Sequence, residues 1–331
     1  MRAIVFEQFG EPADVLRVRE VADPEPGAGE VRVRMIASPV NPSDLMVVRG
    51  RYGVLPRLPA TPGFEGVGVV DRAGPGLVGK LVKGKRVAVL NSKGGNWAEY
   101  AVIPARQARP VPADLPDDQV ATFFVNPASV LAMVRHVLKV PRGEWLLQSA
   151  AGSALGRMLI KLAKNDGIRT INVVRRREAI DQLNELGPDA VISSSDGPIP
   201  DQVRRVTGSD GVRYALDPVG GETGMGVFQS LADEGKMLVY GTLSQQPILI
   251  DPRLMIAGHR VVEGFWLGQW MRQQYVPTLL LLFREIGRSI RSGVLATEVG
   301  ARFPFDQIAD AAREAEVLGR KGKILIDLRS D

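Results

Sequence analysis

The chain of 331 residues has no cysteine and only two histidines, and these absences exclude several kinds of chemistry. Without a thiol it can form no disulfide, no thiolate zinc site and no cysteine nucleophile. His136 and His259 are too few and too far apart in sequence to suggest a metal centre, so we predict no metal ligands. The longest strongly apolar stretch, Val276 to Phe283, contains Pro277 and is too short to span a bilayer, so no membrane partner is expected.

The N-terminus resembles a strand rather than a targeting segment. Met1 to Phe6 runs directly into a strand pattern and Glu7 follows at once, which is not the pattern of a signal peptide. The lack of cysteine fits a reducing compartment. We therefore expect a cytoplasmic protein.

The charge is mildly basic, with a net value of +5 and a pI near 9.5. This balance suits an anionic ligand. No long block of lysine and arginine stands out, so a nucleic-acid partner is not expected.

The most informative stretch of the chain is Leu146 to Arg177. A short apolar strand ends at Leu147, a turn of small residues follows, and a helical apolar pattern runs from Met158 to Ala163. A second strand is predicted over Ile168 to Val174. This order is one βαβ unit, and its turn at a helix N-terminus is where a dinucleotide pyrophosphate binds.

The glycine pattern of that turn is incomplete. A strict G-x-G-x-x-G would need glycine at positions 151 and 153, and only the last glycine, Gly156, is present. Small residues still allow a close backbone approach, and the Ser153 hydroxyl could donate to phosphate; an ordinary strand-to-helix turn is the alternative. The predicted pyrophosphate-binding residues are Ala151, Gly152, Ser153, Ala154, Leu155 and Gly156.

Three consecutive arginines follow the second strand, about 20 residues past the turn. An NAD-preferring site usually has Asp or Glu there, whereas arginine suits a 2′-phosphate. The sequence therefore predicts NADPH as cofactor. We assign Arg175 and Arg177 to the phosphate because alternate residues leaving a strand point the same way; Arg176 is the alternative.

The order of the predicted strands and helices along the chain indicates two domains. Residues up to about 122 form short alternating strands between Gly/Pro turns, which indicates a small β-rich domain, a partly closed barrel. From Asn126 helices and strands alternate, which predicts a doubly wound parallel sheet. After a helix at about Tyr275 to Ser292, short strands at Val299 to Phe303 and Ile324 to Asp327 return to the first domain.

These features resemble the medium-chain dehydrogenase/reductase superfamily over essentially the whole chain. Asn41 to Asp44 resembles the N-P-[SV]-D motif of its zinc-independent branch, and Asp217 to Gly221 resembles the D-x-V-G-G turn. Phe64 stands where the zinc-dependent branch has a ligand histidine. The resemblance implies an α/β protein with a Rossmann-type NADPH-binding domain (residues 123–267) and a GroES-like catalytic domain (residues 1–122 and 268–331).

Finer matches resemble the mitochondrial-type 2-enoyl thioester reductases, above all the run from Phe265 to Trp270. Close neighbours of that group include NADPH:quinone reductases. The resemblance implies metal-free hydride transfer from NADPH to the C=C bond of a 2-enoyl thioester or enone. NADPH:quinone reduction is the alternative, and a non-catalytic NADPH-binding or RNA-binding protein is the second.

The same resemblance implies the site residues. Tyr52 is the expected hydrogen-bond or proton donor, although it could instead be a loop tyrosine packed on the barrel. Asn41 could orient the nicotinamide ribose or the substrate, or only start an Asn-Pro turn. Ser129 is expected near the nicotinamide, or else begins a helix. The remaining expected cofactor contacts are Asn172, Tyr240, Gly241, Thr242, Phe265 and Trp266.

Two further expectations concern partners. A carrier or CoA thioester is anionic, and Arg49, Arg51 and Arg57 around Tyr52 could form a basic entrance, or only a solvated loop. A homodimer joined through edge strands of the nucleotide domain is expected from the resemblance.

Overall fold

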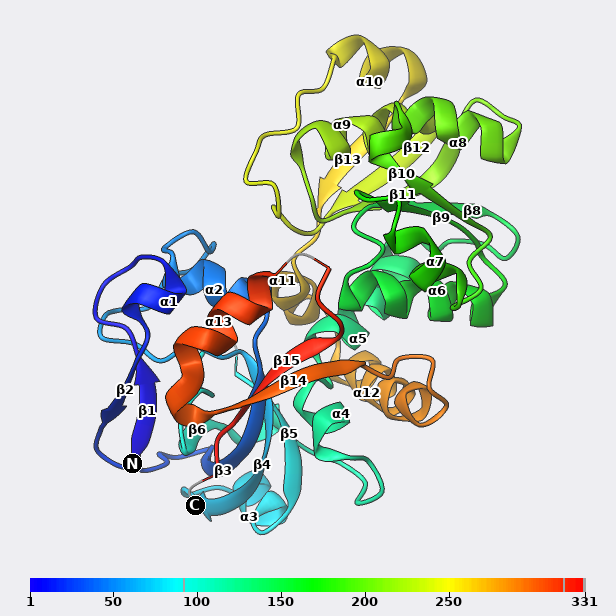
Figure 1. Cartoon of the computed structure of the whole chain (residues 1–331). Helices are drawn as coiled ribbons and strands as arrows, with labels where there is room; N and C mark the ends of the chain where they lie inside the picture. Colours follow the sequence, from blue (N-terminus) through cyan, green and yellow to red (C-terminus); the bar gives the residue numbers. More distant parts are fainter. Residues whose placement is uncertain (92, 318, 330–331) are drawn as a thin grey trace. The chain divides into compact units, whose positions relative to one another are not determined.

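The computed structural model describes residues 1–91, 93–317 and 319–329, which fold as two compact units (Figure 1). Unit 1 comprises Met1–Val125 and Ala296–Asp331, and unit 2 comprises Asn126–Leu295. No described helix is both long enough and apolar enough to cross a membrane.

Unit 1 is built on a seven-stranded sheet in the order β14-β15-β3-β4-β5-β7, with β6 also paired to β3. The long strand β3 pairs with β6 along its first half and with β15 near its end, and β4 follows it for most of its length. Only the β14–β15 pair is parallel among the described pairs of this sheet. Its strands are β3 (Glu30–Pro39), β4 (Glu65–Ala73), β5 (Arg86–Leu90), β6 (Tyr100–Pro104), β7 (Ala108–Pro110), β14 (Val299–Pro304) and β15 (Lys323–Asp327).

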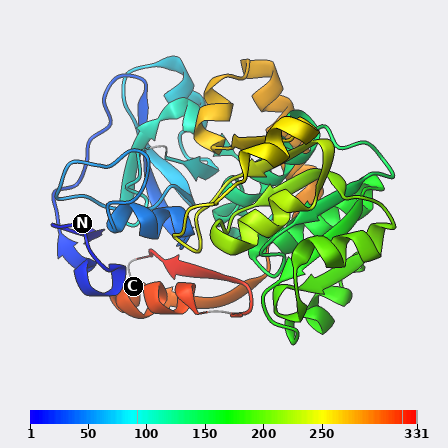
Figure 2. The ribbon, with the colours of Figure 1, turned by 90° about the horizontal axis from the view of Figure 1, so that it is seen from above.

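Short helices and a two-stranded sheet complete unit 1. The small sheet pairs β1 with β2, and Figure 2 shows α13 running along β15 and close to α1. The bounds are β1 (Arg2–Val5), α1 (Pro12–Val15), β2 (Arg17–Glu20), α2 (Pro42–Val48), α3 (Leu77–Val82), η1 (Ala105–Gln107), α4 (Asp117–Ala121), η4 (Phe305–Gln307) and α13 (Ile308–Glu316).

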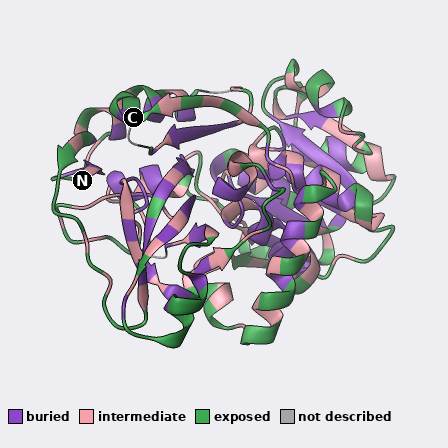
Figure 3. Cartoon of the chain, turned by 90° about the horizontal axis from the view of Figure 1, so that it is seen from below, coloured by how far each residue is buried: buried purple, intermediate pink, exposed green. Residues whose placement is uncertain are grey.

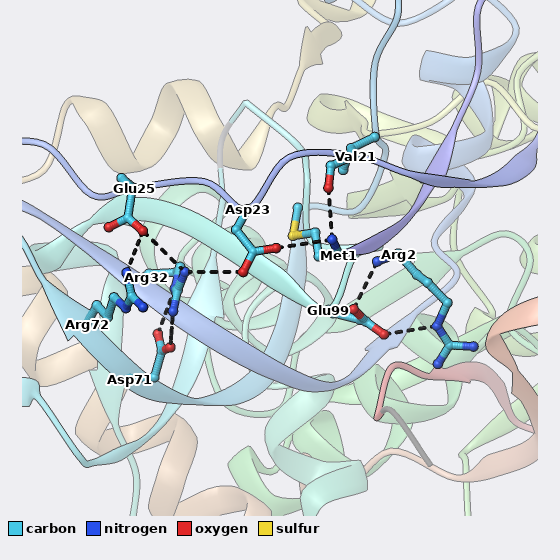
Figure 4. A network of polar contacts seen from close by, with 9 residues as sticks. All are labelled: Met1, Arg2, Val21, Asp23, Glu25, Arg32, Asp71, Arg72 and Glu99. Carbon is cyan, nitrogen blue, oxygen red and sulfur yellow. Dashed lines mark hydrogen bonds and ion pairs between the residues drawn. The ribbon is translucent and has the colours of Figure 1, made fainter.

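A polar network fastens the extended segment between β2 and β3 to the sheet (Figure 4). Arg32 of β3 is only 4% exposed and donates to both carboxylate oxygens of Asp71 on β4, with a shortest distance of 2.6 Å. Asp23 lies 3.8 Å from the same guanidinium and accepts a hydrogen bond from the Met1 ammonium group at 3.1 Å. Because a buried arginine is stable only with carboxylate partners, this contact anchors the segment.

Unit 2 contains a six-stranded parallel sheet in the order β10-β9-β8-β11-β12-β13. Helices α6 and α7 cover one face and α8 and α9 cover the other, as a doubly wound sheet requires (Figure 1). The strands are β8 (Trp145–Gln148), β9 (Arg169–Val174), β10 (Ala190–Ser193), β11 (Val212–Asp217), β12 (Leu231–Val239) and β13 (Val261–Gly264). The helices are α5 (Val125–Leu131), the π-helix η2 (Ala132–Val137), α6 (Ala154–Asp166), α7 (Ala179–Asn184), η3 (Ser194–Asp196), α8 (Ile199–Thr207), α9 (Gly221–Gln229), α10 (Pro252–Gly258), α11 (Leu267–Arg272) and α12 (Val276–Arg291).

The predicted α/β fold class is confirmed, but the units divide at other residues than we predicted. The first boundary follows Val125 rather than residue 122, and the second follows Leu295 rather than residue 267. Helix α12 therefore belongs to unit 2. Its buried face contains Leu282 and Ile286, and its Glu285 forms an ion pair with Arg135 of the π-helix η2. Such long-range packing leaves no local signal in the sequence.

Each unit has its own buried core. Figure 3 shows the strands of both sheets largely buried and the outer faces of the helices exposed. In unit 1 the core includes Val33, Met35 and Trp97, and in unit 2 it includes Leu147 and Phe228. This burial holds the strand ends, where the candidate site residues lie, in fixed positions.

Candidate active site

The turn between β8 and α6 is built for close backbone packing. Ser153 is the N-cap of α6, and its hydroxyl accepts a hydrogen bond from the Gly156 N–H at 3.1 Å. A Cβ on Gly156 would lie 2.6 Å from the carbonyl oxygen of Ala151, so only glycine fits there. In contrast, a Cβ on Gly152 would meet nothing within 4 Å among the described residues. The backbone at Gly156 thus packs tightly against the preceding turn, whereas a side chain would fit at Gly152.

Ala150 gives this turn an unusual backbone. Its φ is +48°, in the left-handed region that residues with a Cβ rarely adopt. The N–H of Ala151 donates to the carbonyl of Val173, which fixes the turn against β9. Strain of this kind persists where the surrounding structure determines the backbone, and it occurs often at ligand sites.

Asn172 is buried in the middle of the sheet. Its amide nitrogen donates to the Thr170 hydroxyl at 2.9 Å and to the Ala190 carbonyl at 3.0 Å, and its oxygen accepts from Gln148 at 2.6 Å. The side chain therefore joins β8, β9 and β10 to one another. Its expected contact with the cofactor stays a prediction.

The three arginines follow the end of β9 and are all exposed. Arg177 lies 3.7 Å from Asp196, a solvent-exposed pair that contributes little to stability, and its side chain remains 77% exposed. The Ser193 hydroxyl donates to the Arg175 carbonyl at 3.1 Å and so links the arginine segment to the end of β10.

The turn that begins at Asp217 lies at the end of β11. The Asp217 carboxylate accepts hydrogen bonds from the Ser149 hydroxyl and from the backbone of Gly220 at 2.8 Å. Burial raises the pKa of Asp217, and these hydrogen bonds oppose the rise. Tyr240 follows β12, and its N–H donates to the Asp217 carbonyl at 3.0 Å. Burial raises the pKa of the Tyr240 hydroxyl, which has no hydrogen-bond partner among the described residues.

Phe265 and Trp266 follow β13. The N–H of Phe265 donates to the Val239 carbonyl at 2.8 Å, and Trp266 is 36% exposed at the N-cap of α11. Because the carboxyl ends of parallel strands share one edge, the predicted residues after β8, β9, β12 and β13 all lie along the carboxyl edge of this sheet.

Ser129 is buried at 6% exposure inside α5 rather than at the N-cap of that helix.

In unit 1, Asn41 is buried at 1% exposure and is the N-cap of α2. Its amide donates to Glu65 at 3.1 Å, and its side-chain oxygen accepts a hydrogen bond from Lys323. The Asp44 carboxylate accepts from the Asn41 N–H at 2.8 Å, which completes a capping box. Asn41 thus caps a helix and belongs to a buried polar cluster, and its expected contact with the nicotinamide ribose or the substrate stays a prediction.

Sequence reasoning missed this cluster of Asp44, Glu65 and Lys323, all at most 2% exposed. Glu65 also accepts from the backbone N–H groups of Phe124 and Val125, at 3.0 and 2.9 Å. Burial raises the pKa of Glu65 and lowers that of Lys323 to about 8. The available signal was a charged residue at the start of two apolar strands, β4 and β15.

Tyr52 lies in the loop after α2 and is half-buried. Its ring packs against Phe64, with 5.2 Å between the ring centroids and an interplanar angle of 38°. The Tyr52 ring, which carries the hydroxyl, is thus partly buried and packs against the unit 1 core. Both expectations for Tyr52, a packed loop residue and a donor, are compatible with this position.

The basic entrance stays a prediction, and one of its three arginines is already paired. Arg49 donates to Glu11 at 2.6 Å and to Glu316 at 2.7 Å, so its charge is already neutralised within unit 1. This arginine joins α2 to the segments around α1 and α13. Of the three arginines, Arg57 is exposed and lies outside such a pair in the described structure.

The comparisons with known proteins agree with this geometry. Residues 27–113 match a family model described as alcohol dehydrogenase GroES-like domain, and residues 154–285 match one described as zinc-binding dehydrogenase. The mitochondrial enoyl-[acyl-carrier-protein] reductase of Xenopus tropicalis is 34% identical over 98% of this chain and 95% of its own.

Two solved structures extend the likeness. The quinone oxidoreductase of Escherichia coli, complexed with NADPH, is 25% identical with a TM-score of 0.91, covering 99% of this chain and 100% of its own. The Etr1p complex with NADP and crotonyl-CoA is 28% identical with a TM-score of 0.84, covering 98% and 99%. The chain belongs to the medium-chain dehydrogenase/reductase family, in the group that includes these enoyl and quinone reductases.

Proposed function

We propose that this protein is an NADPH-dependent oxidoreductase that reduces the C=C bond of a 2-enoyl thioester or related enone without a metal ion. The observation that carries the proposal is the row of exposed arginines at the carboxyl end of β9, beside a small-residue turn into α6. Relatives named as enoyl-[acyl-carrier-protein] reductases support the enoyl substrate. The Etr1p complex, which holds NADP and crotonyl-CoA, supports both cofactor and substrate class.

The residues of unit 2 fit a dinucleotide phosphate. The open space at Gly152 and the N-terminus of the 13-residue helix α6 suit a pyrophosphate. We assign the 2′-phosphate to the exposed Arg175 and Arg177, which can bind it through charge-assisted hydrogen bonds. Tyr240 follows β12 at the same sheet edge, and its hydroxyl is buried without a hydrogen-bond partner among the described residues. When bound, NADPH supplies the hydride.

Hydride addition to the β-carbon places negative charge on the carbonyl oxygen of the substrate, and the α-carbon must then receive a proton. A hydrogen-bond donor aimed at that oxygen lowers the barrier. We assign this role to the Tyr52 hydroxyl. A tyrosine donates without carrying charge of its own, and the packing of its ring on Phe64 orients it.

Quinone reduction is the second candidate, supported by the likeness to the quinone oxidoreductase of Escherichia coli. A quinone needs an apolar cleft rather than a basic entrance, and the pairing of Arg49 with two glutamates is consistent with that. A non-catalytic NADPH-binding or RNA-binding protein is the third candidate.

The decisive experiment follows the loss of NADPH absorbance with crotonyl-CoA and benzoquinone in parallel, with NADH as control. We expect turnover of crotonyl-CoA that prefers NADPH. Turnover of the quinone alone would move the second candidate to first place. NADPH binding without turnover of either, together with salt-sensitive RNA binding, would favour the third candidate.

The donor role has its own test, the variant Tyr52→Phe. We expect kcat to fall roughly 10²- to 10⁴-fold, the usual contribution of a positioned proton donor, with the melting temperature unchanged. The ring is retained, so the contact with Phe64 persists. Full turnover by this variant would exclude Tyr52 as the donor.

We also propose a homodimer formed through β13. This strand is an edge of the unit 2 sheet, and Val261 on it is 45% exposed. An open edge with apolar side chains favours pairing with a second copy.

Light scattering should give twice the chain mass, and Val261→Arg should shift the measured mass towards that of the monomer. The matched control Val78→Arg, on the exposed face of α3 in unit 1, should leave the mass unchanged. A monomeric wild type would exclude this proposal.

The cytoplasmic location stays part of the proposal. Fractionation of cells that produce the tagged chain tests it, and recovery with organelles would contradict it.

A further inference from the structure

We propose that Asp44 is a positioning residue for Tyr52, acting through the backbone of Phe64. The inference rests on the proposed donor role of Tyr52 and deepens it. Tyr52 precedes a loop for which the described residues show no hydrogen bonds, its ring contacts Phe64, and the buried carboxylate of Asp44 anchors the Phe64 backbone.

The loop that follows Tyr52 does not fix its own shape. Residues 53–58 make no hydrogen bond in the described part of the chain, either through their backbone or through their side chains. Packing must therefore contribute to the position of the Tyr52 ring. Tyr52, Leu58 and Phe64 all pack against the unit 1 core, and the Phe64 ring contacts that of Tyr52.

Phe64 is held much more firmly than the loop. Its N–H donates to the Asp44 carboxylate at 3.0 Å, and its carbonyl accepts from the Asn91 N–H at 2.7 Å. Gly63 before it has a φ of +101°, and a Cβ there would lie 2.5 Å from Trp97, so this backbone has little freedom. A ring carried by such an anchored residue is a fixed surface for Tyr52.

Asp44 uses both oxygens as acceptors at a site with no exposure to solvent. One accepts from Phe64, and the other accepts from the Asn41 N–H at 2.8 Å. Protonation would convert one of the two oxygens into a donor facing an N–H group, so only the ionised carboxylate accepts from both Asn41 and Phe64. The charged groups that face Asp44 are Glu65 from β4 and Lys323 from β15.

The ionisation of Asp44 falls within a testable pH range. Burial raises its pKa to about 7, against the hydrogen bond from Asn41 and the positive charge of Lys323, which lower it. The negative charge of Glu65 adds to the rise. Below this pH the anchor of Phe64 weakens, so turnover should decline as the carboxylate gains its proton.

The test is a double-mutant cycle with Asp44→Asn and Tyr52→Phe, measured as kcat with crotonyl-CoA and NADPH. In the wild-type background we expect Asp44→Asn to lower kcat roughly 10- to 100-fold, as small displacements of a catalytic group do. In the Tyr52→Phe background the same change should lower kcat less than about twofold, because the group it positions is already gone. The control Asp181→Asn changes an exposed residue in the first turn of α7 and should change neither.

The pH profile gives the second readout. Wild-type kcat should fall as the pH drops through about 7, and the Asn variant should lack this fall. If Asp44→Asn fails to fold, Phe64→Leu replaces it, because it removes the ring contact while keeping an apolar side chain. Phe64→Leu should lower kcat in the wild-type background only and weaken the fall with pH, because the ring contact through which Asp44 acts on Tyr52 is gone.

The outcomes separate the two proposals. Equal effects of Asp44→Asn, or of Phe64→Leu, in both backgrounds would overturn the positioning role and leave the donor role of Tyr52 intact. Unchanged turnover in Tyr52→Phe alone would overturn both.

Discussion

Lys323 donates a hydrogen bond to the side-chain oxygen of Asn41, and so joins strand β15 to the first turn of α2. The same asparagine donates to Glu65 at 3.1 Å. A neutral amide thus lies between the buried Lys323 and the buried Glu65 and is hydrogen-bonded to both. Buried charges are tolerated only when paired and hydrogen-bonded, so the amide stabilises unit 1 as well as capping a helix.

The first prediction concerns Asn41→Ala. The change removes the helix cap and leaves Lys323 and Glu65 each without one buried partner, so the free energy of unfolding should fall by about 3 kcal/mol. Urea denaturation measures it, with the exposed Asn184→Ala as control, which should stay within about 0.5 kcal/mol of wild type. Loss of turnover at unchanged stability would instead support the expected catalytic role of Asn41.

The second prediction uses two glycines of one turn. Gly156→Ala would place a Cβ 2.6 Å from a backbone oxygen, so we expect a loss of about 2–4 kcal/mol in unfolding free energy. Gly152→Ala meets nothing within 4 Å and should leave stability nearly unchanged. If the open space at Gly152 receives the pyrophosphate, this variant should nevertheless bind NADPH more weakly. Thermal unfolding and NADPH titration of both variants check these expectations. Equal NADPH affinity in Gly152→Ala and wild type would place the pyrophosphate elsewhere.

The sequence predicted the parts of the molecule whose signals are local. The strands around Leu147 and Val173, the helix between them and the arginines that follow are continuous in the chain. Their periodicity and turn residues therefore sufficed. The predicted helix at 275–292 is α12 almost residue for residue.

The remainder depends on contacts between distant positions. The assignment of α12 to unit 2 follows from its packing and its ion pair with Arg135, neither of which has a sequence pattern. Asp44, Glu65 and Lys323 meet only after β4 and β15 have both paired with β3. A single sequence shows each as an ordinary charged residue, and only folding reveals that they are buried together.

The third prediction concerns cofactor choice. Arg175→Ala and Arg177→Ala should each weaken NADPH binding roughly tenfold or more, the loss of one or two charge-assisted hydrogen bonds, and leave NADH binding unchanged. The comparison with NADH isolates the 2′-phosphate, since the two cofactors differ only there. Arg176→Ala is the matched comparison in the same run. A selective loss in Arg176→Ala alone would transfer the role to that residue, and equal losses for NADH would show a structural effect.

The fourth prediction follows from the ionisation of Asp44. Burial raises its pKa from 3.8 to about 7 in the folded state, so the folded protein holds this proton more tightly than the unfolded chain. The stability that this group contributes is complete below its ordinary pKa and is lost as the pH rises through about 7. The loss can reach about 4 kcal/mol, from the size of the shift.

Asp44→Asn does not titrate, so its stability relative to wild type should increase between about pH 5 and about pH 8. Urea denaturation of both proteins at these two values measures the change. The comparison ends at about pH 8 because burial lowers the pKa of Lys323 to about 8. The contribution of Lys323 to the free energy of unfolding grows only as the pH rises above that value. A stability difference that is independent of pH would contradict a raised pKa for Asp44. If the prediction holds, raising the pH weakens the fold while it ionises the carboxylate that anchors Phe64. As the pH rises through about 7, the free energy of unfolding should therefore decrease while kcat increases, so the site is most active where the fold is less stable.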